Sequence, residues 1–79
     1  MDVLDIELPI VDVVATGKNI DNLRKEAGLS IRDIQRIMGF TTPQAIYKWI
    51  WGQSMPKVEN LVILSAIFHT SIDNIIITC

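Results

Sequence analysis

The stretch GFTTPQAIYKW, residues 39–49, ends one helix and begins another. Gly39 is expected to stop the helix that precedes it. Pro43 suits the first turn of a helix, where its missing N–H costs no hydrogen bond, and Thr42 before it is a suitable N-cap. We therefore expect a tight turn after Gly39 and a new helix over residues 43–51.

The expected helix over residues 43–51 has two sides of different chemistry. At about 100° per residue, Ile46, Trp49 and Ile50 fall together and should face a core. The other side gathers hydrogen-bonding, aromatic and cationic groups: Gln44, Tyr47, Lys48 and Trp51. This mixture differs from the Glu/Lys lattice of a purely solvated helix face, which is the alternative for Gln44 and Lys48. Trp51 suits either a partner surface or packing against the N-terminal part of the chain.

Glycines divide the rest of the chain into lengths of about one helix each; they are Gly17, Gly28, Gly39 and Gly52. Thr16 is expected to cap the first helix and Gly28 to end it. Within that helix, Asp21 and Lys25 form a favourable i, i+4 pair.

The second helix is expected to begin at Ser30. This serine can act as the N-cap, and Asp33, three residues later, completes a weaker form of the capping box. The inward side of the helix should carry Ile34, Ile37 and Met38. Phe40, in the turn that follows, is expected to fill the space between the second and third helices.

Two more helices are expected after the loop at residues 52–56. The fourth starts near Lys57, and its inward stripe is Val58, Leu61, Leu64, Ser65 and Phe68. Ser71 caps a short last helix over residues 72–76. Five helices predict an all-α, compact helical domain over residues 16–79.

Residues 1–15 differ in kind from the rest. Apolar side chains alternate loosely with four acids, Asp2, Asp5, Glu7 and Asp12, and Pro9 interrupts the pattern. We expect an extended N-terminal arm that contains a short strand at most.

Composition limits the function classes. A chain of 79 residues, 49% apolar and 20% charged, is one globular domain. Its net charge of −2 disfavours nucleic acid, but residues 30–57 hold four bases against Asp33 alone. These bases are Arg32, Arg36, Lys48 and Lys57. A local positive patch attracts phosphates whatever the sign of the whole chain.

Location and chemistry follow from what the sequence lacks. An acidic start argues against a signal peptide, and no apolar stretch is long enough to cross a bilayer. Cys79 is the single cysteine, so we expect a reducing cytoplasm. No histidine pair, Cys/His couple or glycine-rich phosphate loop is present. We therefore expect no enzyme activity, no cofactor and no metal. His69 is expected to be a cation at the C-terminal end of a helix or a surface group, not a metal ligand.

The segment LSIRDIQRIMGFTTPQAIYKWIWGQSMPKVENLVILSAIFHTSIDNII, residues 29–76, resembles the lambda-repressor/Cro-like (Xre-type) helix-turn-helix family. The likeness extends over about residues 16–77. The order of the words GLS, RDIQ, IYKW and TSID is specific as a set. The resemblance implies a five-helix DNA-binding domain whose recognition helix is residues 43–51.

The resemblance also implies site residues. Base-reading positions fall on Thr42, Pro43, Gln44, Tyr47 and Lys48. Phosphate-contacting positions fall on Ser30, Arg32, Gln53, Ser54 and Lys57. The chemistry fits, because a glutamine amide suits adenine N6 and N7 and a lysine suits guanine O6 and N7 or a phosphate.

Two features depart from the family pattern. The turn after Gly39 is one residue longer than in the phage repressors. Many relatives also carry an acidic residue where Ile50 stands, paired with an arginine of the first helix. Arg24 lacks that partner here and is expected to pair elsewhere or stay solvated.

We therefore expect a sequence-specific transcriptional regulator, a repressor, that binds double-stranded DNA as a homodimer. A short recognition helix reads few base pairs, so two copies should bind half-sites about 34 Å apart on a near-palindrome. Candidates for the dimer surface are Ile63, Ile67, Ile75, Ile76 and Ile77. One alternative is a protein-interaction module, such as an antitoxin or accessory protein, with residues 1–15 holding the partner. Another is a fragment of a larger protein.

Overall fold

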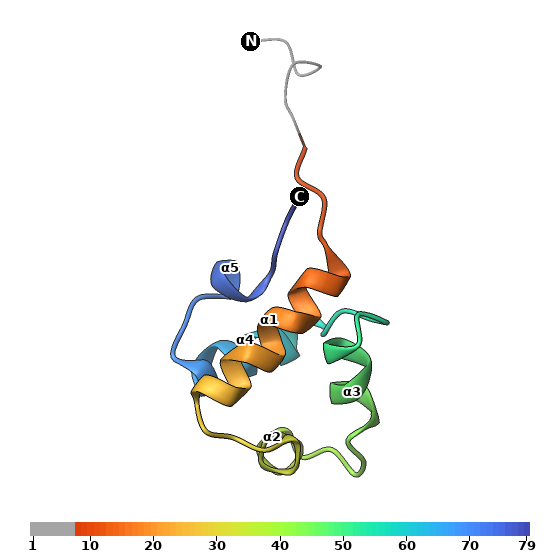
Figure 1. The fold of residues 1–79 in the computed structure, drawn as a ribbon. Helices are drawn as coiled ribbons and strands as arrows, with labels where there is room; N and C mark the ends of the chain where they lie inside the picture. Colours follow the sequence, from red (N-terminus) through yellow and green to blue (C-terminus); the bar gives the residue numbers. More distant parts are fainter. Residues whose placement is uncertain (1–7) are drawn as a thin grey trace.

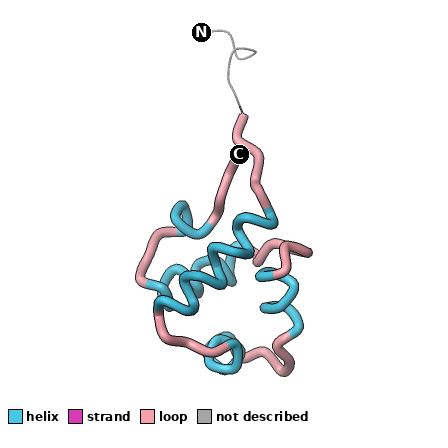
Figure 2. The backbone as a smooth tube through the Cα atoms, in the orientation of Figure 1, coloured by secondary structure: helices cyan, strands magenta, loops and turns pink. Residues whose placement is uncertain are grey.

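The computed structural model describes residues 8–79, and five helices account for most of this part of the chain (Figure 1). They are α1 (Val13–Glu26), α2 (Ile31–Met38), α3 (Gln44–Ile50), α4 (Val58–Phe68) and α5 (Ile72–Ile75). Loops join the helices, and Figure 2 shows no strand among the described residues. The predicted all-α, five-helix domain is confirmed.

Helix α1 begins earlier than the sequence predicted. Asp12 is its N-cap, and the Asp12 carboxylate accepts a hydrogen bond of 3.0 Å from the Ala15 backbone N–H. Thr16 lies inside the helix, so its prediction as the N-cap is wrong. The helical part of the chain therefore starts at Val13, and the predicted boundary between residues 15 and 16 falls within α1.

The two ends of the described chain run side by side, away from the helices (Figure 1). Val11 and Thr78 form an antiparallel bridge. On either side of it, Asp12 N–H donates to the Ile77 carbonyl and Cys79 N–H to the Ile10 carbonyl, both at 2.8 Å. We call residues 8–12 and 77–79 the terminal ribbon. The arm predicted for residues 1–15 is extended over residues 8–11, and its acids Asp2, Asp5 and Glu7 lie outside the described residues.

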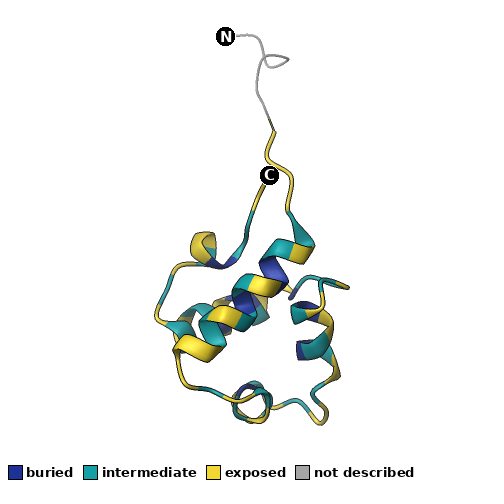
Figure 3. Cartoon of the chain, in the orientation of Figure 1, coloured by how far each residue is buried: buried dark blue, intermediate teal, exposed yellow. Residues whose placement is uncertain are grey.

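All five helices contribute to one apolar core. Its buried members are Ile20, Ile34, Ile46, Trp49, Leu61, Leu64 and Ile75. Figure 3 shows buried positions close to exposed ones along the same helix, as in α1. The predicted inward positions in α3, and Leu61 and Leu64 in α4, are confirmed.

Two predicted core residues are wrong, since Ile37 is 54% exposed and Val58 is 72% exposed. In α2 the core stripe is Ile31, Ile34 and Met38, and Ile37 lies off that stripe. Val58 is the first residue of α4, where the helix extends beyond the core. Ile37 and Val58 each stand three residues from a core residue, Ile34 or Leu61, which is why helical spacing predicted burial. Each lies toward an end of its helix.

Helix α1 lies against the end of α3 at backbone distance. A Cβ atom added at Gly17 would lie 2.1 Å from the Trp49 carbonyl oxygen, so only glycine fits here. From the other side, a Cβ atom at Gly52 would lie 2.8 Å from the Cα of Val14. This contact fixes the position of α3 on α1.

Short-range contacts hold the ends of α2 and the start of α5 as predicted. Ser30 and Asp33 form the reciprocal capping box of α2. Gly39 ends α2 with φ 73°. Phe40 packs edge-on against Trp49, with ring centroids 5.9 Å apart. The Ser71 hydroxyl oxygen accepts from a backbone N–H in α5 at 3.3 Å.

Arg24 finds its partner on its own helix, which confirms that it pairs elsewhere than in the family pattern. Its guanidinium donates to the Asp21 carboxylate at 2.8 Å and to the Leu29 carbonyl at 2.8 Å. Lys25 approaches the same carboxylate at 3.3 Å, as the i, i+4 spacing predicted. Burial raises the pKa of Asp21, but the hydrogen bonds from Arg24 and Lys25 outweigh it, so the pKa is lowered.

Candidate nucleic-acid interface

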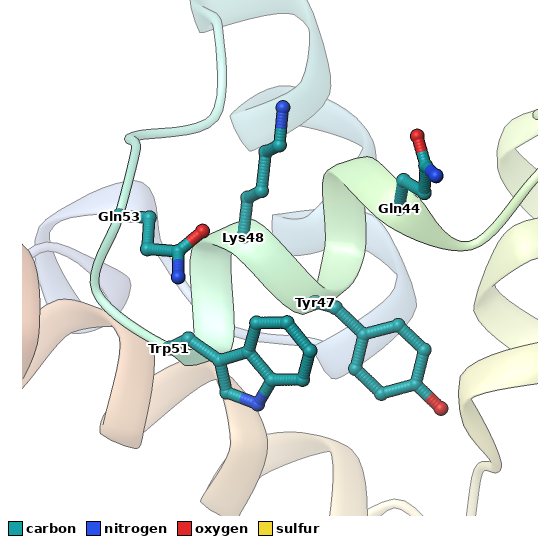
Figure 4. Close-up of a pocket in the computed structure, with 5 residues that line it drawn as sticks. All are labelled: Gln44, Tyr47, Lys48, Trp51 and Gln53. Atoms are coloured by element: carbon teal, nitrogen blue, oxygen red, sulfur yellow. The ribbon is translucent and has the colours of Figure 1, made fainter.

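The outward side of α3 carries the groups that the sequence predicted there. Gln44, Tyr47, Lys48 and Trp51, together with Gln53 from the following loop, line one open depression (Figure 4). Gln44 and Lys48 are exposed, Tyr47 is half-buried, and Trp51 is 62% exposed. Because Ile46 and Trp49 of the same helix are buried, this side of α3 cannot turn inward. The depression therefore faces solvent.

The start of α3 differs from the prediction by one residue. The helix spans Gln44–Ile50 rather than residues 43–51, and Pro43 is its N-cap, with no side-chain capping bond. Thr42 is therefore not the N-cap and stays exposed just before the helix. The Pro43 carbonyl accepts the first helical hydrogen bond, from the Tyr47 N–H at 3.1 Å. Proline can do this because only its carbonyl, and not an N–H, is needed.

Tyr47 and Trp51 stack on each other one helical turn apart. Their ring centroids are 5.1 Å apart and the ring planes are inclined by 28°. Trp51 thus packs on a side chain of the preceding helical turn. The i, i+4 spacing is the sequence signal for such a pair.

The loop after α3 is tied to the helix by its backbone. The Lys48 carbonyl accepts from the N–H groups of Gln53 and Ser54 at 2.9 and 3.3 Å. Gln53, predicted as a phosphate contact, consequently lies beside Gln44 and Lys48 in the depression. Ser54 is half-buried, whereas Lys57 is exposed at the N-cap of α4.

At the start of α2, two predicted phosphate-contacting residues are exposed, Ser30 and Arg32. Ser30 Oγ accepts from the Asp33 N–H at 3.0 Å. Hydrogen bonds from the Ser30 backbone and side chain lower the pKa of Asp33. An ionised carboxylate therefore stands beside Ser30 and offsets part of the attraction for a phosphate at this point.

The candidate dimer residues fall into different environments. Ile75 is fully buried in the core, so its prediction as part of a dimer surface is wrong. Its burial follows from the chain folding back after α4, which places α5 against α1 and α4. Ile67 and Ile76 are partly buried against the same core, and Ile77 is half-buried. Ile63 remains exposed on α4.

Residues 8–79 contain no group of three or more histidine, cysteine or acidic side chains that could hold a metal ion. His69 is exposed and ends α4 in the left-handed conformation, with φ 51°. Among the helices of the described chain, none combines the length and apolar character needed to span a bilayer.

This arrangement, a short helix with an exposed amide and ammonium supported by an apolar helical body, defines a helix-turn-helix protein. A family model described as helix-turn-helix matches residues 20–75. The chain belongs to this family, the lambda-repressor-like (Xre-type) helix-turn-helix proteins, which are DNA-binding transcription regulators.

A solved structure shows the same fold. The crystal structure of the restriction-modification controller protein C.AhdI from Aeromonas hydrophila superposes with a TM-score of 0.71 at 20% sequence identity. The alignment covers 81% of this chain and 96% of that chain. A comparison with curated protein sequences found no match.

Proposed function

We propose that this protein reads a specific operator by laying α3 in the major groove of double-stranded DNA. It binds as a homodimer on a near-palindrome and represses transcription in the cytoplasm by occupying a promoter site. The observation that carries the proposal is the exposed side of α3, where Gln44 and Lys48 share a depression with Gln53.

The chemistry of that side suits base edges. Gln44 offers one acceptor and two donors, which match adenine N7 and N6, and Lys48 suits guanine O6 and N7. Ile46 and Trp49 are buried and anchor α3 on the core. Gln44 and Lys48 therefore project from a helix whose position is fixed. A rigid support is what precise recognition requires.

Phosphate attraction is supplied by exposed bases outside α3. Arg32 and Lys57 are both exposed, and they lie on α2 and at the N-cap of α4. The net charge of −2 makes long-range attraction weak. Base contacts must then contribute a larger share of the affinity for the selected site.

The test begins with selection of duplexes from a random pool at stated salt. Gln44→Ala and Lys48→Ala should each weaken binding to the selected site by about 1–3 kcal/mol, with little change on unrelated duplexes. Arg32→Ala and Lys57→Ala should weaken binding to all duplexes alike. Each should reduce the slope of log K against log salt by about one unit.

Lys18→Ala is the matched control, because Lys18 is an exposed lysine on α1 outside the proposed interface. It should leave site preference unchanged. A wild-type protein that selects no duplex, or a Gln44→Ala variant with full site preference, would contradict the proposal.

A second candidate function, a protein-interaction module, is favoured by the terminal ribbon. Leu8 is 78% exposed there and Ile10 is also exposed, so apolar side chains stand in solvent. In the sequence, residues 1–15 also carry four acids, and this apolar and acidic composition suits a protein partner. This function is the better account if no duplex is selected while a protein partner still binds the four variants of the proposed DNA interface, at Gln44, Lys48, Arg32 and Lys57.

A further inference from the structure

The exposed side of α3 is divided into two stripes. Tyr47 and Trp51 project from one flank of the helix, and Gln44 and Lys48 project from the other (Figure 4). The phenol oxygen and the indole nitrogen lie at the outer edges of the stacked rings (Figure 4). We call Tyr47 and Trp51 the aromatic pair.

The aromatic pair is held in place by the backbone beneath it. Trp51 N–H donates to the Tyr47 carbonyl at 2.9 Å, and Gly52 N–H donates to the Trp49 carbonyl at 3.0 Å. Gly52 in turn lies against Val14 of α1. An exposed indole on so fixed a support offers a binding surface at small entropic cost.

The dimensions of the major groove would place the flank of α3 that carries the aromatic pair against a sugar–phosphate strand, which forms one wall of the groove. The groove is about 12 Å wide, and a helix with its side chains is about 10–12 Å across. A helix that directs Gln44 and Lys48 toward base edges therefore places a neighbouring flank against a sugar–phosphate strand. That wall presents apolar deoxyribose faces and acceptor oxygens of phosphates.

The aromatic pair matches this wall in chemistry. The indole N–H is a donor only, and a phosphate oxygen is an acceptor only. The ring faces are apolar and uncharged, and the deoxyribose carbons are apolar and uncharged as well. We propose that Trp51 and Tyr47 form an uncharged backbone contact, with the rings on deoxyribose and the Trp51 Nε1–H donating to a phosphate oxygen. This inference rests on the proposed DNA-binding function.

The test uses Trp51→Phe, which keeps a ring but removes the N–H, and Trp51→Ala, which removes both. Trp51→Ala should bind the selected duplex and unrelated duplexes about tenfold more weakly, and Trp51→Phe should fall between it and wild type. The salt slope should not change, because no charge is removed. This result distinguishes the contact from those of Arg32 and Lys57.

A second measurement locates the phosphate. Each phosphate of the selected duplex is replaced in turn by a neutral methylphosphonate. At one position the replacement should weaken wild type but have no further effect on Trp51→Phe, as expected when both changes remove the same hydrogen bond.

Leu8→Ala is the matched control, since it removes an exposed apolar side chain from the terminal ribbon and should not change DNA affinity. Thermal unfolding of each variant confirms that it is folded. Undiminished DNA binding by Trp51→Ala would overturn the inference. So would a loss of affinity that depends on the identity of one base pair, because that would indicate a base contact rather than a backbone contact. In both cases Gln44→Ala still loses site preference, so the proposed function stands. A wild type that binds no duplex overturns both.

Discussion

Thr16 is a buried polar residue whose hydrogen bonds reach across the chain. Its Oγ1 accepts from the Ile77 backbone N–H at 2.9 Å, between residues 61 positions apart. The same hydroxyl lies 3.5 Å from the Ile77 carbonyl, to which it can donate. One side chain thus joins α1 to the terminal ribbon.

Replacing Thr16 with valine should lower the free energy of unfolding by about 1–3 kcal/mol, because the Ile77 N–H loses its acceptor in a partly buried place. Urea unfolding measures the change. Thr16→Ser keeps the hydroxyl and should retain most of the stability lost in Thr16→Val. Equal loss in the two variants would mean that the methyl group, not the hydrogen bond, stabilises this contact.

Trp51 shows why the role of a single residue depends on its neighbours. Its position near the outer side of α3 was visible from helical spacing, and its exposure confirms it. The stack on Tyr47 adds what matters for binding, because it fixes the direction of a ring that is 62% exposed (Figure 4). A tryptophan in that setting suits an uncharged contact better than a core position.

Among the helices, the contact of α1 with α3 has the greatest consequence for function. Gly17 and Gly52 allow these helices to approach at backbone distance. The orientation of α3, and with it of Gln44 and Lys48, is set from behind by α1. In the proposed mode of binding, small residues at this contact would therefore influence recognition through the orientation of α3.

Gly17→Ala should lower the free energy of unfolding by about 1–3 kcal/mol through overpacking. The loss should appear although alanine favours the helix by about 1 kcal/mol over glycine. Thermal and urea unfolding measure it. Lys18→Ala, the next residue along α1, is exposed and should change stability by no more than about 0.5 kcal/mol. A Gly17→Ala variant more stable than wild type would show that α1 and α3 adjust freely.

At the scale of the whole molecule, the proposed dimer would place two copies of α3 on the two half-sites of an operator. Several apolar side chains are exposed on α4, and among the candidates for a partner surface Ile63 is the exposed one. Burying it against a second copy would add to a small core.

Ile63→Glu should convert the protein to a monomer, because a carboxylate in an apolar interface is costly to desolvate. Sedimentation velocity measures the oligomeric state. Binding to the near-palindrome should weaken, while binding to a single half-site should not. Val58→Glu is the control, since Val58 is exposed on the same helix but is not a candidate for the dimer surface. An unchanged sedimentation coefficient in Ile63→Glu would contradict the assignment.

Local order in this protein follows from neighbours in the chain. The capping box of Ser30 and Asp33, the end of α2 at Gly39 and the two sides of α3 depend on residues within one or two helical turns. Hydrogen bonds and helical spacing at that range are encoded in short words of the sequence. The class of fold and the candidate recognition surface were therefore predictable from it.

Other features depend on contacts between distant residues. The terminal ribbon and the burial of Ile75 rest on contacts between the first and last parts of the described chain, as in the bond from Ile77 to Thr16. The exposure of Ile37 and Val58 likewise depends on where neighbouring elements end. Spacing along a helix gives the side on which a residue lies, but burial requires a second element to cover that side, and only packing in three dimensions supplies it.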